Sequence, residues 1–138
     1  IINRSDDNSF RKLFNYISGA NNTSEEIKMT IPVTQTKKNN ESFMQFYLPS
    51  KFTKETIPIP SNSDIEIATI KEGYFAVIKY SGRSSDKNFV KYSQTLYQKL
   101  LEDKILIKGS AIKATYNSPF TLPPFRRNEA MFNVDWKN

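Results

Sequence analysis

Two segments of the chain carry apolar residues at helical spacing. Residues 6–17 have apolar positions at i, i+3, i+4 and i+7, which predicts an amphipathic helix with one apolar face. The members of this face are Phe10, Leu13, Phe14 and Ile17. Residues 85–102 predict a second helix, because Phe89, Leu96 and Leu100 form one stripe. This stripe is widened by Val90, Tyr97 and Leu101.

Alternation of apolar and polar residues predicts the strands. The segments are 26–36, 42–48, 64–70, 73–80, 110–117 and 129–135, with a short extended piece at 105–107. In the first, Ile27, Met29, Ile31 and Val33 are expected on one buried face. Pro32 interrupts that segment, and because proline cannot donate to a ladder the strand must be an edge, carry a bulge or end there.

Short polar links predict the turns. Asn39 and Asn40 indicate a turn between the first two strands, and Lys71, Glu72 and Gly73 indicate a hairpin between the next two. The order of elements is then a helix followed by two strands in each half of the chain. This order predicts an α+β fold in one domain over residues 1–138, pseudo-duplicated, with two helices packed on one side of an antiparallel sheet.

Composition removes several kinds of chemistry. The chain has 138 residues with no cysteine and no histidine, so disulfides, thiolate nucleophiles and imidazole ligands are excluded. The four glycines form no phosphate-binding loop. The net charge is +6, but the basic residues are dispersed, which does not predict nucleic-acid binding. No apolar run approaches the roughly 18 residues of a membrane helix, no paired carboxylates indicate an enzyme, and the absence of an export signal makes the cytoplasm the default compartment.

Six short pieces, in order, resemble the SOUL haem-binding family. They begin with the exit of the first helix, where the residues that match the family pattern are Phe10, Leu13, Tyr16, Ile17, Gly19 and Asn21. The following pieces are Ile27 to Val33, Phe43 to Pro49, Pro58 with Pro60, Tyr80 to Gly82, and Tyr116 with Pro119 and Arg126 to Glu129. The chain is therefore identified as similar to that family over most of its length.

The resemblance implies both a fold and a ligand. Family members fold as a twisted β-barrel-like sheet with two helices, and the two strands that usually precede the first helix are not expected here. The chain would then be N-terminally incomplete relative to the family. The family is described as binding haem and other tetrapyrroles in a shallow hydrophobic cleft beside the first helix. The implied function is non-enzymatic haem or tetrapyrrole binding, here without histidine ligation.

Candidate site residues follow from that implied cleft. The floor of the cleft would be formed by Phe10, Leu13, Phe14 and Ile17. Periodicity alone favours an ordinary core face for these residues, and the resemblance makes the cleft an equal alternative. Met29 would offer a soft contact or a thioether, and Tyr16 and Tyr47 are the candidate phenolate ligands of iron. The haem propionates would pair with cations. The candidates are Lys12, Lys28, Arg126 and Arg127.

The chain departs from the family at two lysine positions, which are Asn15 and about Leu122 here. Arg126 and Arg127 have an alternative role as structural ion-pair partners of Glu129 or a nearby carboxylate. Two other functions remain open. One is an effector-binding module for amphipathic cations, which an acidic cleft residue such as Glu66 or Glu129 would favour. The other is an interaction domain whose open sheet edge forms a dimer or takes a partner strand.

Overall fold

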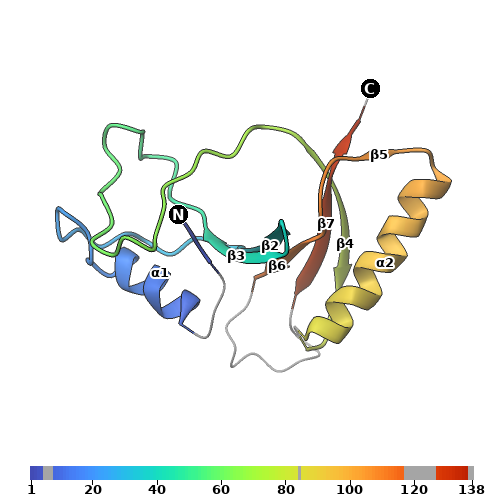
Figure 1. Ribbon diagram of the computed structural model, residues 1–138, viewed down its shortest axis with the longest axis horizontal. Coiled ribbons are helices and arrows are strands. Elements are labelled where there is room, and N and C mark those ends of the chain that lie inside the picture. Colours follow the sequence, from blue (N-terminus) through green and yellow to red (C-terminus); the bar gives the residue numbers. More distant parts are fainter. Residues whose placement is uncertain (5–7, 84, 117–126, 137–138) are drawn as a thin grey trace. The chain divides into compact units, whose positions relative to one another are not determined.

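The computed structural model describes residues 1–4, 8–83, 85–116 and 127–136. The chain divides into two compact units, unit 1 over Ile1–Thr69 and unit 2 over Ile70–Asn138. Each unit contains one helix and its own set of antiparallel strands, which Figure 1 shows in sequence colours. The predicted α+β class with antiparallel strands and two helices is confirmed.

Unit 1 is a three-stranded antiparallel sheet with one helix. Strand β3 lies between β1 and β2. The elements in chain order are β1 (Ile2–Arg4), α1 (Ser9–Ile17), β2 (Val33–Lys38) and β3 (Glu41–Phe46). Strand β1 was not predicted from the sequence, because three residues are too few to reveal an alternation.

The predicted turn between β2 and β3 is confirmed. Lys38 pairs with Glu41, which leaves Asn39 and Asn40 as a two-residue loop with φ values of 53° and 63°. Two-residue hairpin loops favour positive φ at both positions, and asparagine tolerates that conformation better than most residues.

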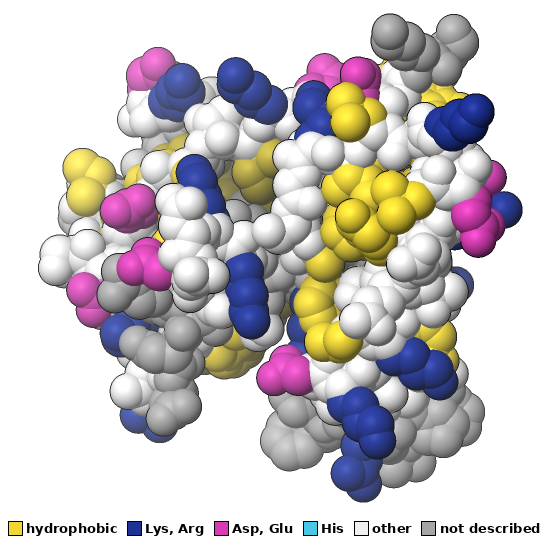
Figure 2. Space-filling view, turned by 45° about the vertical axis from the view of Figure 1, so that its right-hand side comes forward, with side chains coloured by type: hydrophobic (Ala, Val, Ile, Leu, Met, Phe, Trp, Pro, Cys, Tyr) yellow, Lys and Arg dark blue, Asp and Glu magenta, His cyan; other side chains and the backbone are white. Residues whose placement is uncertain are grey.

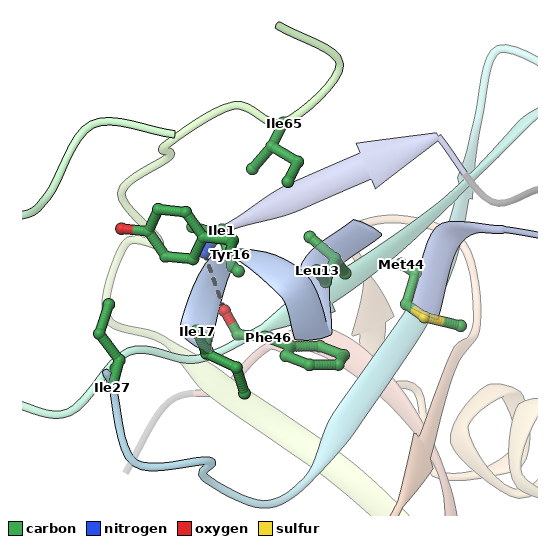
Figure 3. Packing of buried hydrophobic residues seen from close by; sticks show 8 residues of the cluster. All are labelled: Ile1, Leu13, Tyr16, Ile17, Ile27, Met44, Phe46 and Ile65. Atoms are coloured by element: carbon green, nitrogen blue, oxygen red, sulfur yellow. Dashed lines mark hydrogen bonds between the residues drawn. The ribbon is translucent and has the colours of Figure 1, made fainter. Parts of the chain in front are cut away.

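The core of unit 1 lies between α1 and β3. Figure 3 shows the side chains that meet there. Leu13, Tyr16 and Ile17 come from α1, while Met44 and Phe46 come from the inward face of β3. Ile1, Ile27 and Ile65 complete the cluster. The alternate residues Met44 and Phe46 share a face because successive side chains of a strand point to opposite sides.

Unit 2 has the same kind of sheet with a longer helix. Strand β7 lies between β6 and β4, and the short β5 pairs with the far end of β7. The elements are β4 (Tyr74–Tyr80), α2 (Asp86–Glu102), β5 (Leu106–Ile107), β6 (Ile112–Thr115) and β7 (Asn128–Asp135). Leu100 of α2 packs on Phe132 and Val134 of β7, which form the core of this unit.

The two units repeat one topology. Each contains a strand, a helix and two further paired strands, and in each the last strand lies between the other two. This confirms the predicted pseudo-duplication. The repeat begins one strand earlier than predicted, so β1 and β4 are corresponding strands, as are β3 and β7.

Two strand predictions were wrong in detail. The strand predicted over 26–36 begins only at Val33, directly after Pro32, which has no amide hydrogen for a ladder. No strand forms over 64–70 or across the predicted hairpin at 71–73. Glu66 makes only an isolated bridge with Ile2, and a bridge between a single pair of residues does not form a strand. The predicted proline-rich loop at 118–125 lies outside the described residues.

Candidate functional site

The predicted apolar face of α1 is divided between core and surface. Leu13 has no exposed surface and Ile17 is 5% exposed, so both belong to the core. Phe10 and Phe14 are each 45% exposed. Leu13 and Ile17 therefore support the helix from beneath, and only the two phenylalanines present apolar area to a ligand.

Phe10 and Phe14 form one aromatic surface, which we call the α1 ledge. Their ring centroids lie 6.1 Å apart with an angle of 12° between the ring planes. Phe10 also packs edge-on against buried Phe46 of β3, with centroids 5.4 Å apart. Because each ring is half exposed and Phe10 contacts Phe46, the α1 ledge is a surface feature that is anchored to the core. Hydrophobic side chains also gather on the face of the molecule that Figure 2 shows, with lysine and arginine side chains around them.

The basic residues of α1 lie on different sides of the helix. Lys12 forms an ion pair with Asp64, with 3.2 Å between Nζ and the carboxylate oxygen. At about 100° per residue, Lys12 lies on the side of the helix away from Phe10 and Phe14. Arg11 is one turn before Phe14 and only about 60° from it around the axis. Arg11 is exposed and makes no ion pair with the residues that the structure describes. Sequence reasoning missed Arg11, although its i, i+3 spacing to Phe14 was a usable signal.

The segment after α1 carries Met29 at the surface. Met29 is 40% exposed and Ile31 65% exposed, so the expectation that they lie on a buried strand face was wrong. The reason is that no strand forms before Pro32, and the strand alternation therefore does not apply. The Ile27 amide donates to the Ile17 carbonyl, and the Thr30 hydroxyl donates to the carbonyl of Tyr47. The segment thus passes from the end of α1 to the end of β3.

Tyr16 is a core residue rather than an open phenol. Its side chain has no exposed surface, and its hydroxyl donates to the Pro58 carbonyl at 2.6 Å. Burial, with a smaller effect of the Glu25 carboxylate, raises the pKa of Tyr16 above its ordinary value. A phenolate ligand for iron needs a deprotonated and accessible oxygen, and the surroundings of Tyr16 oppose both conditions. Tyr47 has 36% of its surface exposed and therefore meets the condition of accessibility.

Two buried tyrosines should respond differently to loss of the hydroxyl. At neutral pH, Tyr16→Phe is expected to lower the free energy of unfolding by about 1–2 kcal/mol, because the Pro58 carbonyl loses its donor. Tyr80→Phe should cost nothing or stabilise slightly. The Tyr80 hydroxyl is buried and has no hydrogen-bond partner among the described residues. Urea denaturation of the two variants and the unsubstituted protein at neutral pH measures both effects.

The same two substitutions should alter how the free energy of unfolding depends on pH in alkaline solution. Burial raises the pKa of Tyr80, with a smaller effect of Tyr92, as it does that of Tyr16. Below the ordinary pKa of 10.0 both folded and unfolded chains keep these protons. Above it the unfolded chain loses them first, so stability falls as the pH rises from there towards the folded pKa. Each phenylalanine variant should show a shallower fall, and an unchanged slope in both would contradict this assignment.

Asn21 organises the exit from α1. Its side chain is buried, and its amide nitrogen donates to the carbonyls of Tyr16 and Glu25, at 3.0 and 2.9 Å. Its amide oxygen accepts from the backbone of Thr23 and Glu25 and from the Thr23 hydroxyl. Gly19, at φ +121°, supplies the left-handed turn that precedes it. We call this group the Asn21 clamp; it fixes where the helix ends and where the following segment starts.

Arg127 makes the structural ion pair that the sequence had offered as its alternative role. Its guanidinium lies 3.1 Å from one carboxylate oxygen of buried Glu129 and over the ring of Tyr116, at 4.4 Å from the ring centroid. The Tyr116 hydroxyl donates to the other oxygen of Glu129. Both oxygens of the carboxylate therefore have partners within unit 2. Arg126 lies outside the described residues, so its role as a propionate partner stays a prediction.

The family profile described as "SOUL heme-binding protein" matches residues 2–133, and so covers both units. The chain belongs to the SOUL haem-binding family. A curated relative, "Heme-binding protein 2" of Mus musculus, is 32% identical over 121 residues. That match covers 82% of this chain and 58% of the relative, so the chain spans little more than half of the relative's length.

In this SOUL family chain, the helix-exit motif serves the structure. Tyr16, Gly19 and Asn21 build the core and the Asn21 clamp, while Phe10, which also belongs to the motif, is half exposed. Neither described helix is long and apolar enough to cross a membrane. Among the described residues, acidic side chains form no group of three or more that could hold a metal ion.

Proposed function

We propose that this protein binds haem or a related tetrapyrrole non-covalently on the α1 ledge, and that it performs no chemistry on it. The observation that carries the proposal is the stacked pair of half-exposed phenylalanines, Phe10 and Phe14, backed by buried Phe46. Membership of the SOUL family and the printed name of the mouse relative supply the ligand class.

A flat aromatic ligand suits this surface physically. Aromatic rings gain stacking energy beyond the area they bury. The rings of Phe10 and Phe14 are nearly parallel and stacked on each other, so a planar macrocycle can extend the stack on an exposed ring. The anchoring contact with Phe46 restricts the ledge before binding, which lowers the entropy cost of ordering side chains.

The border of the proposed site comes from neighbouring segments of unit 1. Met29 and Ile31 are exposed apolar residues on the segment that begins beside Ile17 and reaches Tyr47. Because this segment joins the two elements that hold the α1 ledge, we place Met29 and Ile31 at its margin. Of the two candidate phenolate ligands, Tyr16 and Tyr47, we place Tyr47 at this margin as the one that could reach an iron.

Binding of this kind has a predictable specificity. With no histidine in the chain, the affinity comes from contact with the macrocycle rather than from an imidazole–iron bond. Contact area discriminates poorly between metal-containing and metal-free rings. The function that follows is reversible binding, suited to buffering or delivery of a tetrapyrrole.

Arg11 is the cation that we assign to the ligand's carboxylates. Arg11→Glu is expected to weaken binding of a dicarboxylate porphyrin about fivefold, since an exposed charge pair contributes about 1 kcal/mol or less and reversal adds repulsion. The dimethyl ester of the same porphyrin should bind both proteins alike. Fluorescence titration of free acid and ester at low salt measures this difference.

Lys12→Gln is the matched control for Arg11. It removes the neighbouring positive charge, which is held in the ion pair with Asp64 on the other side of the helix. A loss of free-acid binding in Lys12→Gln but not in Arg11→Glu would reverse the assignment and return the role to Lys12.

The proposed function is tested by titrating the protein with ferric haem and with metal-free protoporphyrin while following the Soret band. Saturable binding of both rings with similar affinity supports a stacking site that needs no iron ligand. Saturable binding of haem alone would contradict that mode and direct attention to Tyr47 and Met29. Absence of saturable binding of either ring would overturn the proposed function.

A further inference from the structure

Helix α2 carries its own exposed apolar stripe. Val90, Tyr97 and Leu101 were expected to widen the buried face of this helix, but they are 48%, 42% and 50% exposed. At about 100° per residue the three positions fall within roughly 40° of one another. They therefore form one narrow surface along the helix, which we call the α2 ledge.

The α2 ledge is anchored to the core of unit 2 in the way that the α1 ledge is anchored in unit 1. Tyr97 contacts Phe132 with ring centroids 6.0 Å apart, as Phe10 contacts Phe46 at 5.4 Å. Phe132 and Phe46 are both buried. They also occupy corresponding strands, because β7 and β3 are each the middle strand of their unit.

The two ledges lie on the same side of their helices. In α1 the exposed Phe14 directly follows buried Leu13, and in α2 the exposed Leu101 directly follows buried Leu100. One step along an α-helix is a rotation of about 100° in a fixed direction. Both ledges are therefore displaced from the buried face by the same angle and in the same sense.

A basic residue also borders the α2 ledge, although not at the place that corresponds to Arg11, which is Gln98. Lys87 precedes Val90 by three residues and therefore lies about 60° from it around the helix axis. Lys87 is exposed and makes no ion pair with any residue in the described part of the chain. The α2 ledge thus combines apolar area with a positive rim, which is complementary to a flat apolar ligand that carries carboxylates.

We infer that the α2 ledge is a second binding surface for the same ligand class, an anionic tetrapyrrole. This inference rests on the proposed function, because the ligand class is taken from the α1 ledge. The internal repeat supplies the argument, because each unit presents an aromatic residue anchored on its middle strand and a neighbouring exposed apolar residue. Lys87 adds the positive charge at the border of the α2 ledge. The protein would then hold two tetrapyrroles, one per unit.

The test counts bound ligand in the unsubstituted protein and in five variants of the full chain. Metal-free protoporphyrin is titrated by isothermal calorimetry into the unsubstituted protein, Phe14→Asp, Leu101→Asp and the double variant. Val90→Asp is a second probe of the α2 ledge, at a position that is 48% exposed. Thr95→Asp is the matched control, since Thr95 is an exposed α2 residue more than about 100° from the ledge.

The expected result is two ligands per chain in the unsubstituted protein and in Thr95→Asp, one in each single ledge variant, and none in the double variant. A single ligand that is lost in Phe14→Asp and kept in both α2 variants would overturn the second site while the proposed function stands. No binding at all would overturn both. A dimer in light scattering that Leu101→Asp converts to a monomer, with unchanged ligand count, would show that a second copy covers the α2 ledge and would also overturn the inference.

Discussion

Replacing Phe14 with aspartate is expected to weaken haem and protoporphyrin binding to unit 1 about a hundredfold. Phe14 contributes half of the α1 ledge and leaves 45% of its surface exposed in the free protein. Losing its contact costs about 1 kcal/mol of apolar burial. Covering a carboxylate with a macrocycle costs about 2 kcal/mol more, because the charge loses water without gaining a partner. The sum of about 3 kcal/mol corresponds to two powers of ten in the dissociation constant.

Two controls separate this effect from a loss of structure. Phe14→Leu keeps an apolar side chain and should weaken binding only a few fold, since some contact area remains. Ile67→Asp places the same charge at a similarly exposed isoleucine, 41% against 45%, and should leave binding unchanged. Circular dichroism of each variant verifies the fold. Normal binding by a folded Phe14→Asp protein would show that the α1 ledge is not the site.

Replacing Asn21 with alanine should lower the free energy of unfolding by about 3 kcal/mol. The buried amide makes five hydrogen bonds in the Asn21 clamp. Each typical intramolecular hydrogen bond contributes about 1 kcal/mol, and a buried group left without a partner costs more. Some backbone groups of Thr23 and Glu25 regain water in the variant, which limits the total loss. Urea denaturation with a linear extrapolation provides the measurement.

Asn15→Ala is the matched control for the Asn21 clamp. Asn15 is an exposed asparagine of the same region, located on α1. Alanine has the highest helix propensity, so this variant should change stability by no more than about 0.5 kcal/mol. A similar small change in Asn21→Ala would mean that the hydrogen bonds seen around its side chain contribute little.

Local signals in the sequence were sufficient for much of the fold. Helix α2 begins where the Ser85 side chain accepts a hydrogen bond from the Asn88 amide, and serine is one of the residue types that favour this capping position. The turn at Asn39 and Asn40 was predicted because asparagine accepts positive φ. The repeat of one topology was also visible as an order of elements, without any residue identity between halves.

Nonlocal effects explain where the strand predictions failed. The alternation from Ile27 to Val33 is indistinguishable from that of a strand, but a strand needs a partner ladder as well as a pattern. Pro32 breaks the ladder, and the residues before it bind instead to the end of α1 and to the residue after β3. The isoleucines at 67 and 70 alternate in the same manner, yet both are exposed.

The sequence predicted which residues form the apolar face of α1, but it did not predict which of them are exposed. Periodicity places Phe10, Leu13, Phe14 and Ile17 together, and it cannot say where the neighbouring strand stops covering them. That boundary depends on β3, whose Phe46 contacts Phe10 but leaves Phe10 and Phe14 each 45% exposed. The choice of Arg11 rather than Lys12 as the cation for the ligand's carboxylates also depends on a distant residue. Asp64, far away in the sequence, pairs with Lys12.

The strand order of unit 1 also bears on how the chain reaches this structure. The β2–β3 hairpin closes through only two residues, whereas β1 must find β3 across the intervening helix and loops, with Ile2 opposite Gln45. Closing a short loop costs less conformational entropy than closing a long one. We therefore expect the hairpin to form early in folding and β1 to dock late. Because Phe46 belongs to that hairpin, the support beneath the α1 ledge would be in place before the helix settles on it.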